Sequence, residues 1–421
     1  MSITIETAAS PGERGPAIVD LTDPESFAVD VPHAAFAAIR ERPGLYWQPT
    51  TLGVANGGFW AVTRFADIVA VERDPATFSS SHGGAYPMTN QDPRSSEART
   101  HLMMSDPPQH SRLRRAAAKG FSPRVVANFE PWVREIVREV LDRVEGKQEF
   151  DYVIEFARTI PALVLARVLG IPDENRDALV SWAINVFDVM EPTEGLAEGQ
   201  GMSEVVHAEN FKMADFALRL QAAKRARPAD DMFTQLGACV DSGELSQEEF
   251  LNWVLLMMAA GFETTHTAIG QSMRMYLENP EIAIATDRAI GDGLIDRVVD
   301  EYLRLITPPM QMARTATRDV AFAGEHVREG DVMVMYFIAG NRDPAVFSEP
   351  DRFNPWRTET ETLAFGSGVH RCIGAHLAKL EVRILWEELR ARRVMLRLKG
   401  QPRRGRSIFI NQLKALPVRR V

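Results

Sequence analysis

The stretch FGSGVHRCIG, residues 365–374, carries the most information about the fold and chemistry of this chain. Cys372 stands just before an apolar-periodic run that predicts a long helix over residues 375–393. A sulfur at that point faces free backbone N–H groups and the positive end of the helix dipole. Because both favour the thiolate over the thiol, the stretch predicts an anionic sulfur ligand.

The glycines of this stretch support the same interpretation. Gly366, Gly368 and Gly374 remove side chains around Cys372, so we expect a flat ligand to lie close to the backbone. A thiolate that accepts N–H hydrogen bonds suits the axial position of a haem iron. The alternative is an inert, buried cysteine in a glycine-rich turn, as most single cysteines are. Cys239, the other cysteine, fits that alternative because its apolar helical stretch has no special neighbours.

Composition limits the class of protein. The chain has 421 residues, of which 45% are hydrophobic and 25% charged, as in globular proteins with a large core. A formal net charge of -9 argues against nucleic acid as a partner. Two cysteines make a disulfide framework improbable and fit a reducing compartment. The first residues lack a basic segment followed by an apolar run, and residues 254–261 are too short to span a bilayer, so we expect a cytoplasmic protein.

Residue periodicity predicts one large, mostly helical domain with a minor sheet lobe, over residues 21–421, after a flexible leader of residues 1–20. A small hairpin is expected at 45–48 and 58–63, where short aromatic or β-branched runs flank a glycine-containing segment. Short strands are expected at 320–323, 332–337 and 407–418, and a proline-rich meander at 343–356. The three- and four-residue apolar spacing predicts helices at 131–144, 154–169, 213–225, 247–275, 295–305 and 375–393.

The sequence AGFETT, residues 260–265, lies inside the predicted helix 247–275. A glycine in a helix interior costs about 1 kcal/mol relative to alanine, so Gly261 needs a reason, and room for a small bound molecule supplies one. Glu263 and Thr264 then place a carboxylate and a hydroxyl beside that space, where they form a suitable proton relay. The alternative is a solvated glutamate and a threonine that bonds back to the helix carbonyl.

Residues 365–374 match the haem-binding signature F-G-x-G-x-H-x-C-x-G of the cytochrome P-450 superfamily at every fixed position, and the chain resembles that family over nearly its whole length. The resemblance implies a mainly α fold with a minor β lobe (α+β), with a long central helix over haem b. It implies a haem-thiolate monooxygenase that uses O2, with Cys372 as the axial ligand of the iron. The AGFETT segment resembles the family's acid–alcohol motif, in which aspartate is commoner at the position of Glu263. The residues that the resemblance places around the cofactor are Ala260, Gly261, Phe365, Gly366 and Gly374.

Two further sets of residues follow from the resemblance. In the family, a glutamate, an arginine and an arginine of the meander form a buried ionic triad, which here corresponds to Glu301, Arg304 and Arg352. Residues 106–114, DPPQHSRLR, resemble the family's D-P-P-x-H-x-x-x-R segment. His110 and Arg114 stand four apart and so share one helical face. Together with Arg314 and His370, they are the expected partners of the two haem propionates, because buried carboxylates need cationic or hydrogen-bonding neighbours.

The chain has no Walker A loop and no convincing dinucleotide-binding turn, so electrons for the iron must come from another protein. Resemblance to soluble bacterial members implies a ferredoxin, fed by a ferredoxin reductase that uses NAD(P)H. Five basic residues that flank the cysteine and propionate segments suggest a docking face for an acidic carrier. An ordinary solvated charge cluster is the alternative. The five are Arg112, Arg115, Lys119, Arg371 and Lys379.

The expected substrate is a hydrophobic small molecule of the terpenoid, sterol or alkyl-chain type. Four apolar residues stand where family members contact substrate, and methionine adapts to irregular apolar shapes. They are Met257, Met310, Met312 and Ile408. Two other functions stay open: a haem-thiolate enzyme that uses peroxide, against which the presence of both Glu263 and Thr264 argues, and a non-catalytic haem-dependent sensor.

Overall fold

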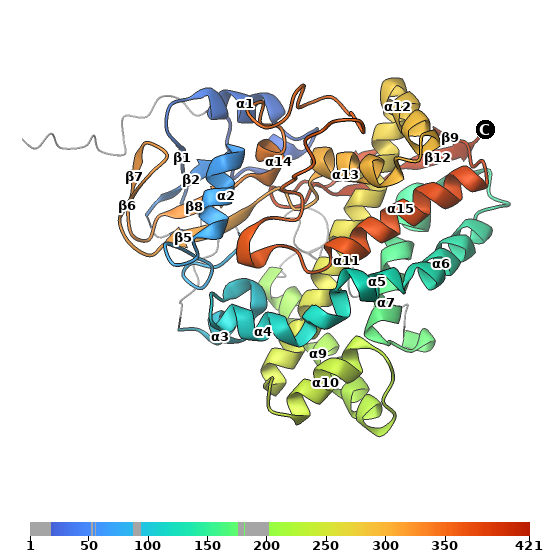
Figure 1. The fold of residues 1–421 in the computed structure, drawn as a ribbon, viewed down its shortest axis with the longest axis horizontal. Helices are drawn as coiled ribbons and strands as arrows, with labels where there is room; N and C mark the ends of the chain where they lie inside the picture. The colour runs from blue at the N-terminus through green and yellow to red at the C-terminus, as the bar shows by residue number, and fades with distance from the viewer. Residues whose placement is uncertain (1–17, 52–53, 55, 87–93, 176–180, 182–201) are drawn as a thin grey trace, which may run out of the picture.

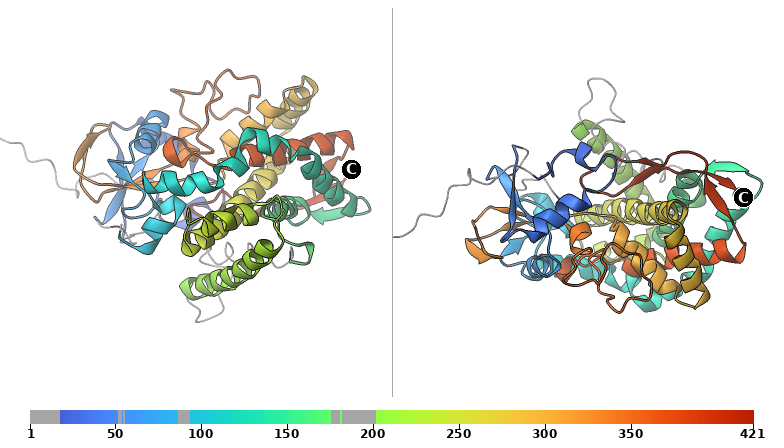
Figure 2. Two further views of the ribbon diagram at one scale, coloured as in Figure 1. Left: turned by 60° about the horizontal axis from the view of Figure 1, so that its bottom comes forward. Right: turned by 90° about the horizontal axis from the view of Figure 1, so that it is seen from above.

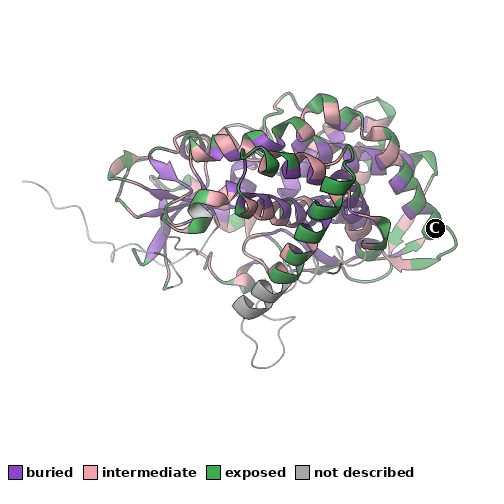
Figure 3. Cartoon of the chain, turned by 90° about the horizontal axis from the view of Figure 1, so that it is seen from below, coloured by how far each residue is buried: buried purple, intermediate pink, exposed green. Residues whose placement is uncertain are grey.

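The computed structural model describes residues 18–51, 54, 56–86, 94–175, 181 and 202–421. A sheet lobe lies at one end of the molecule and a larger helical part at the other, with helix α11 crossing the middle in yellow (Figure 1). Seen from below, buried residues concentrate in the strands and on the inner faces of the helices (Figure 3). Seventeen of the twenty residues predicted as a leader, 1–17, lie outside the described residues.

The main sheet has five strands in the order β1-β2-β8-β5-β3. Strands β1 (Tyr46–Pro49) and β2 (Gly58–Val62) pair antiparallel, with Trp47 opposite Trp60, which confirms the predicted hairpin. Strand β2 then pairs in parallel with β8 (Val332–Met335). Alternate side chains enter two separate apolar clusters, one with Phe59 and the other with Trp60, as the two-residue period of a strand requires. Strands β5 (Met312–Ala316) and β3 (Phe78–Ser79) complete the sheet.

The central helix α11 (Gln247–Glu278) organises the helical part. Its first turn is closed by a capping box, in which the Ser246 hydroxyl accepts a hydrogen bond from the Glu249 N–H and the Glu249 carboxylate accepts one from the Ser246 N–H. Helices α7 (Thr159–Leu169), α13 (Ile295–Ile306) and α15 (Ala375–Ala391) pack against it (Figure 2). Most of the second half of α11 is buried, so this helix is fixed on several sides.

The remaining elements surround this frame. The other α-helices are α1 (His33–Glu41), α2 (Phe65–Arg73), α3 (Ser96–Thr100), α4 (Gln109–Ala118), α5 (Pro123–Ala127), α6 (Glu130–Arg143), α9 (Met202–Ala226), α10 (Met232–Asp241), α12 (Pro280–Gly291) and α14 (Phe337–Gly340). Short 3-10 turns are η1 (Pro24–Phe27), η2 (Leu102–Met104), η3 (Lys119–Phe121), η5 (Asp173–Asn175) and η6 (Gly368–His370). The small sheets use β4 (Glu149–Asp151), β6 (Val320–Phe322), β7 (Glu325–Val327), β9 (Leu396–Leu398), β10 (Arg403–Arg404), β11 (Leu413–Ala415) and β12 (Pro417–Arg420).

Two predicted elements differ in detail from the structure. The helix expected at 154–169 begins with a π-helical segment, η4 (Val153–Arg158), before α7 continues it. The strand expected at 407–418 is instead two short strands, β11 and β12, which join different sheets. Asp151 accounts for part of this difference, because its carboxylate accepts hydrogen bonds from the N–H groups of Val153 and Leu416 and so ties the two segments together.

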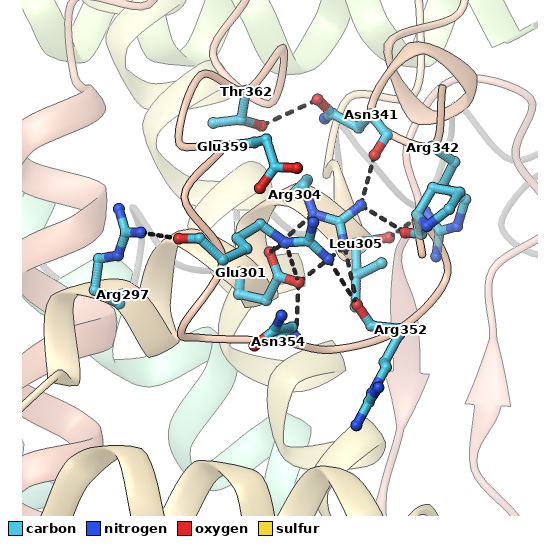
Figure 4. Close-up of polar contacts among 12 residues, drawn as sticks. Arg297, Glu301, Arg304, Leu305, Asn341, Arg342, Arg352, Asn354, Glu359 and Thr362 are labelled. Carbon is cyan, nitrogen blue, oxygen red and sulfur yellow. Dashed lines mark hydrogen bonds and ion pairs between the residues drawn. The ribbon is translucent and has the colours of Figure 1, made fainter. Parts of the chain in front are cut away.

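The ionic triad forms around Glu301, but its third side chain is Arg357 and not Arg352. Glu301 binds Arg304 with Oε–N distances of 2.8 and 2.9 Å and accepts two bonds from Nε of Arg357, at 2.9 and 3.1 Å. The Arg357 side chain is 5% exposed, whereas that of Arg352 is 67% exposed and pairs with Glu349. Arg352 contributes only its backbone carbonyl, which accepts bonds from both triad arginines (Figure 4).

The triad ties helix α13 to the meander. Arg304 also donates to the carbonyls of Asn341 and Pro350, and the Phe347 ring packs against both guanidinium groups. With these bonds the buried charges are paired and hydrogen-bonded, which is the condition for tolerating them in a protein interior. These contacts therefore fix the position of the meander, which leads to the cysteine segment, relative to α13.

We expect Arg357→Ala to lower the free energy of unfolding by about 3 kcal/mol, because it leaves part of a buried carboxylate unpaired. Arg352→Ala is the matched control, and we expect a change within about 0.5 kcal/mol because its side chain is exposed. Denaturant unfolding of both variants measures the difference. An equal loss of unfolding free energy in the two variants would show that Arg357 is not the third member of the triad.

Candidate active site

The cysteine segment is a folded loop between the meander and α15. The N–H of Cys372 donates to the Phe365 carbonyl at 2.9 Å, and the N–H of Gly366 donates to the Leu363 carbonyl at 2.9 Å. Turn η6 lies between these bonds, and α15 begins three residues after the cysteine. The loop therefore places Cys372 at the N-terminal end of α15, as the sequence predicts.

Helix α2 holds this loop through Glu72, which sequence analysis missed. The buried Glu72 carboxylate accepts a 2.6 Å hydrogen bond from the Ser367 N–H. Gly366 and Gly368 have φ values of +63° and +61°, and a Cβ at Gly368 would lie 2.2 Å from the Glu72 carbonyl oxygen. The expectation that these two glycines clear space for a flat ligand is therefore wrong: they allow positive φ angles and the close approach of α2.

Opposing effects act on the Cys372 thiol. The N–H groups of Gly374 and Ala375 and the charges of Arg114 and Arg371 lower its pKa, which agrees with the predicted preference for the anion. Desolvation is the larger effect, however, so the pKa of Cys372 lies above its ordinary value although the side chain has exposed surface. A metal cation bound to the sulfur would favour the thiolate further.

The four basic residues expected to bind carboxylates come together near the loop. The rings of His110 and His370 lie 4.2 Å apart, and Arg114 donates to the carbonyl of Arg371 at 2.6 Å. Arg314 is buried in β5, and its guanidinium donates a hydrogen bond to the carbonyl of Ala313. Segments from α4, β5 and the cysteine loop thus meet at one concentration of positive charge.

The pKa values show how strongly this group is desolvated. Burial, followed by repulsion from Arg114 and Arg314, lowers the pKa of His110 to about 4. Burial, Arg314 and His110 likewise lower the pKa of His370. Nε2 of His110 is buried and has no hydrogen-bond partner among the residues that the structure describes. This group has more positive charge and hydrogen-bond donors than its neighbours balance, so it suits a ligand that carries carboxylates.

Ala260 and Thr264 share one face in the middle of α11. Ala260 is exposed and Thr264 partly exposed, although most residues that follow them on the helix are buried. The Thr264 hydroxyl donates to the Ala260 carbonyl at 2.7 Å, which is the local bond named above as the alternative to a relay. A Cβ on Gly261 would meet Leu165 of α7 at 3.4 Å, so Gly261 faces that helix, and Ala260 is the small residue on the exposed face.

Glu263 lies on a different face of α11 from Thr264. Its side chain is 4% exposed, and Oε2 lies 3.3 Å from Nδ1 of His266, whose side chain is 1% exposed. The partner histidine was not singled out from the sequence, although its i, i+3 spacing from Glu263 was a signal for it. The predicted acid is therefore buried and paired within its own helix.

The four residues expected to contact substrate are differently placed. Met257 is buried in the helical core on α11, with 6% of its surface exposed, and Met312 and Ile408 are partly buried. Met310 has no exposed surface and packs in the core of the sheet lobe, so its expected position in a pocket is wrong for this structure. Its backbone still lies near Ile408, since its N–H donates to the carbonyl of the neighbouring residue Phe409.

The five basic residues expected to dock an electron carrier divide into two kinds. Arg112 pairs with Glu249, and Lys379 pairs with Asp300 at 2.5 Å, so these two charges are already neutralised. The side chains of Arg115, Lys119 and Arg371 are exposed. The exposed part of the basic face is therefore smaller than predicted.

Comparisons with known proteins agree with this geometry. The family model "Cytochrome P450" matches residues 220–389. The chain is 35% identical to "Putative cytochrome P450 126" of Mycobacterium tuberculosis, over 89% of this chain and 90% of that protein. It is 31% identical to "Linalool 8-monooxygenase" of Pseudomonas putida, over 95% and 98%. The chain belongs to the cytochrome P450 family.

Solved structures place the fold in the same family. A Mycobacterium marinum cytochrome P450, CYP268A2, in complex with pseudoionone, is 29% identical, with a TM-score of 0.83 over 92% of this chain and 94% of that one. The protein is thus a P450 monooxygenase, an oxidoreductase that uses haem b, O2 and electrons drawn from NAD(P)H through redox partners. Among the described residues, no helix is both long enough and apolar enough to cross a bilayer.

The described residues fit haem b. The haem iron would be a cation beside the Cys372 sulfur, whose pKa burial raises. The two haem carboxylates would pair with the group of Arg114, Arg314, His110 and His370. The unpartnered Nε2 of His110 and the exposed Ala260 agree with a ligand between α4, α11 and the cysteine loop.

We expect Gly368→Ala to displace the cysteine loop, because a Cβ there meets the Glu72 carbonyl and the left-handed backbone costs about 1 kcal/mol. The result should be a lower haem content per protein and a lower unfolding midpoint. Gly146→Ala is the control, since nothing lies within 4 Å of its Cβ. Haem absorbance per protein measures the effect, and full occupancy in the Gly368 variant would contradict it.

We expect the protein without haem to lose stability as the pH falls from 6.5 to about 4. The folded state holds His110 neutral down to about 4, so below pH 6.5 the unfolded state takes up the proton first. The loss due to this residue is at most about 3 kcal/mol. His110→Asn should remove it, whereas His326→Asn, at an exposed histidine, should not. Unfolding free energies at pH 7 and pH 4 test this expectation.

Proposed function

We propose that this P450 inserts one oxygen atom from O2 into an unactivated carbon of a terpenoid, sterol or alkyl-chain molecule, with electrons delivered by a ferredoxin. The observation that carries the proposal is the position of Cys372 at the start of α15, beside the N–H groups of Gly374 and Ala375. When bound there, the haem supplies the oxidising chemistry, and the thiolate favours cleavage of the O–O bond. The side chains of the protein bind the haem, supply protons and contact the substrate.

Binding and orientation of the haem are assigned to the basic group. Arg114 and Arg314 neutralise the propionates, and His110 and His370 donate hydrogen bonds to them. These assignments rest on burial and on the pKa values of the two histidines, which stay low although Asp106 acts to raise that of His110. Phe365, Gly366 and Gly374 shape the loop around the sulfur, and Ala260 leaves space on the opposite side.

Proton supply is assigned to Glu263 and Thr264. The Thr264 hydroxyl lies on the exposed face beside Ala260, where it orders water near the reacting oxygen. Glu263 is the acid behind it. Both residues are consistent with the use of O2, because its reduction consumes protons that these side chains would supply, whereas peroxide already carries its own protons.

The substrate class is assigned from the apolar surroundings and from relatives. Met257, Met312 and Ile408 supply flexible apolar contacts and no charge. Linalool, which names the substrate of one relative, and pseudoionone, bound to a structural neighbour, are the compounds that we propose to test first. Arg115, Lys119 and Arg371 form the exposed face for an acidic ferredoxin, in the cytoplasm, where two unpaired cysteines stay reduced.

The decisive experiment is the absorption spectrum of the reduced protein with carbon monoxide. We expect a strongly red-shifted Soret band, as thiolate ligation produces, and turnover of a lipophilic substrate with ferredoxin, reductase and NAD(P)H. Cys372→Ala should abolish the band and the product, whereas Cys239→Ala, at the second cysteine, should keep both. A globin-like band in the unaltered protein would reject the proposal, and haem binding without any product would favour a sensor.

A further inference from the structure

One face of α11 carries three buried polar side chains, each with an atom that lacks a partner. Glu263, His266 and Thr267 stand at i, i+3 and i+4, so their side chains share that face. Oε1 of Glu263, Nε2 of His266 and Oγ1 of Thr267 are buried and have no hydrogen-bond partner among the described residues. Each such atom costs about 1–3 kcal/mol if it stays unsatisfied, so this face calls for an explanation.

The Glu263–His266 pair differs from two other buried glutamates of the protein, Glu301 and Glu388. Glu301 binds two arginines, and Glu388 binds Arg134 and Arg138. An arginine holds a carboxylate in its charged form and never releases a proton. Glu263 has instead, within the described part of the chain, a histidine as its ion-pair partner. Histidine gains and loses a proton near neutral pH, so this pair can exist in two forms.

We propose that His266 is a positioning residue that holds Glu263 on this face of α11 and shares one proton with it. This inference rests on the proposed role of Glu263 as the acid. In the resting form, His266 is an imidazolium and Glu263 a carboxylate, with Nδ1–H donating to Oε2. The two opposite charges cancel, which makes their burial tolerable.

Proton transfer within the pair needs no redox partner. The Nδ1–H bond breaks and an Oε2–H bond forms, which leaves a neutral imidazole and a carboxylic acid. The acid then gives its proton to water, and a proton that returns from water to the carboxylate passes on to Nδ1, which restores the imidazolium. No electron moves in these steps, and Nε2–H is kept throughout. We assign ordered water as the partner of Nε2, Oε1 and the Thr267 hydroxyl, because a buried water bonds about three polar atoms.

Infrared spectra of the haem-loaded protein test the resting form without any turnover. We expect no protonated-carboxyl band from Glu263 in the unaltered protein. In His266→Gln, which keeps a hydrogen-bond donor but cannot carry the proton, a protonated-carboxyl band should appear. The band should be absent from the double variant His266→Gln/Glu263→Gln. Thr265→Val, a buried change on the same helix, should leave the spectrum unchanged. A His266→Gln spectrum without the new band overturns the proposal.

Turnover with the redox partners and a substrate is the second measurement. His266→Gln should keep the red-shifted carbon monoxide band but lower the product formed per O2 consumed, by about tenfold or more, and raise the solvent isotope effect. The double variant should be no worse than Glu263→Gln alone, because the two residues act as one unit. Coupling within twofold of the unaltered protein would contradict the proposal.

Two further outcomes keep this proposal distinct from the proposed function. If the unaltered protein lacks the thiolate band, the proposed function fails, while the infrared comparison still tests the pair. If His266→Gln does not fold, nitrogen NMR of labelled histidines replaces it. The unaltered protein should show a buried imidazolium signal that disappears in Glu263→Gln, and a signal that persists would contradict the shared proton.

Discussion

The contact between α2 and the cysteine loop is the constraint on which the rest of the site depends. Two glycines with positive φ angles bring the loop against Glu72, and the Ser367 N–H donates to that carboxylate. This contact sets where α15 begins and therefore where the Cys372 sulfur lies. N–H groups and two arginines surround the sulfur, and a metal bound there would favour its thiolate form.

The same balance of burial against charge recurs elsewhere in the protein. At Glu301 every buried charge has a matched partner, and the result is rigid support for the meander. Around His110 positive charge is in excess, and the result is a site that a carboxylate-bearing ligand completes. At Glu263 the charge depends on one shared proton. Fully paired charges thus support the fold at Glu301, excess positive charge provides a binding site around His110, and a pair that exchanges a proton serves the reaction at Glu263.

The sequence predicts those features that local patterns determine. The cysteine signature, the central helix, the hairpin and the helix after the loop agree with the structure, because each depends on periodicity or on a motif of high specificity. Arg357 could not be distinguished from Arg352, since one directly follows and the other lies within a meander without a regular period, and only the tertiary fold buries one of them. The reason for Gly366 and Gly368 was also beyond reach, because it depends on Glu72, nearly 300 residues away. His266, the partner of Glu263, could have been predicted from the sequence because it stands only three residues further along the same helix.

The parallel pairing of β2 with β8 has a consequence for how the chain is made. Phe59 lies beside Val332, so the hairpin near the start of the chain stays an open edge until the ribosome has added some 270 more residues. Contacts of such long sequence separation form slowly. The helices between the two strands are synthesised before β8 and can begin to pack, whereas the main sheet can be completed only after β8 is made. Strand β8 is the last strand of the main sheet to be synthesised, and it precedes the cysteine loop in the chain. The main sheet can therefore be completed only shortly before Cys372, the proposed haem ligand, is made.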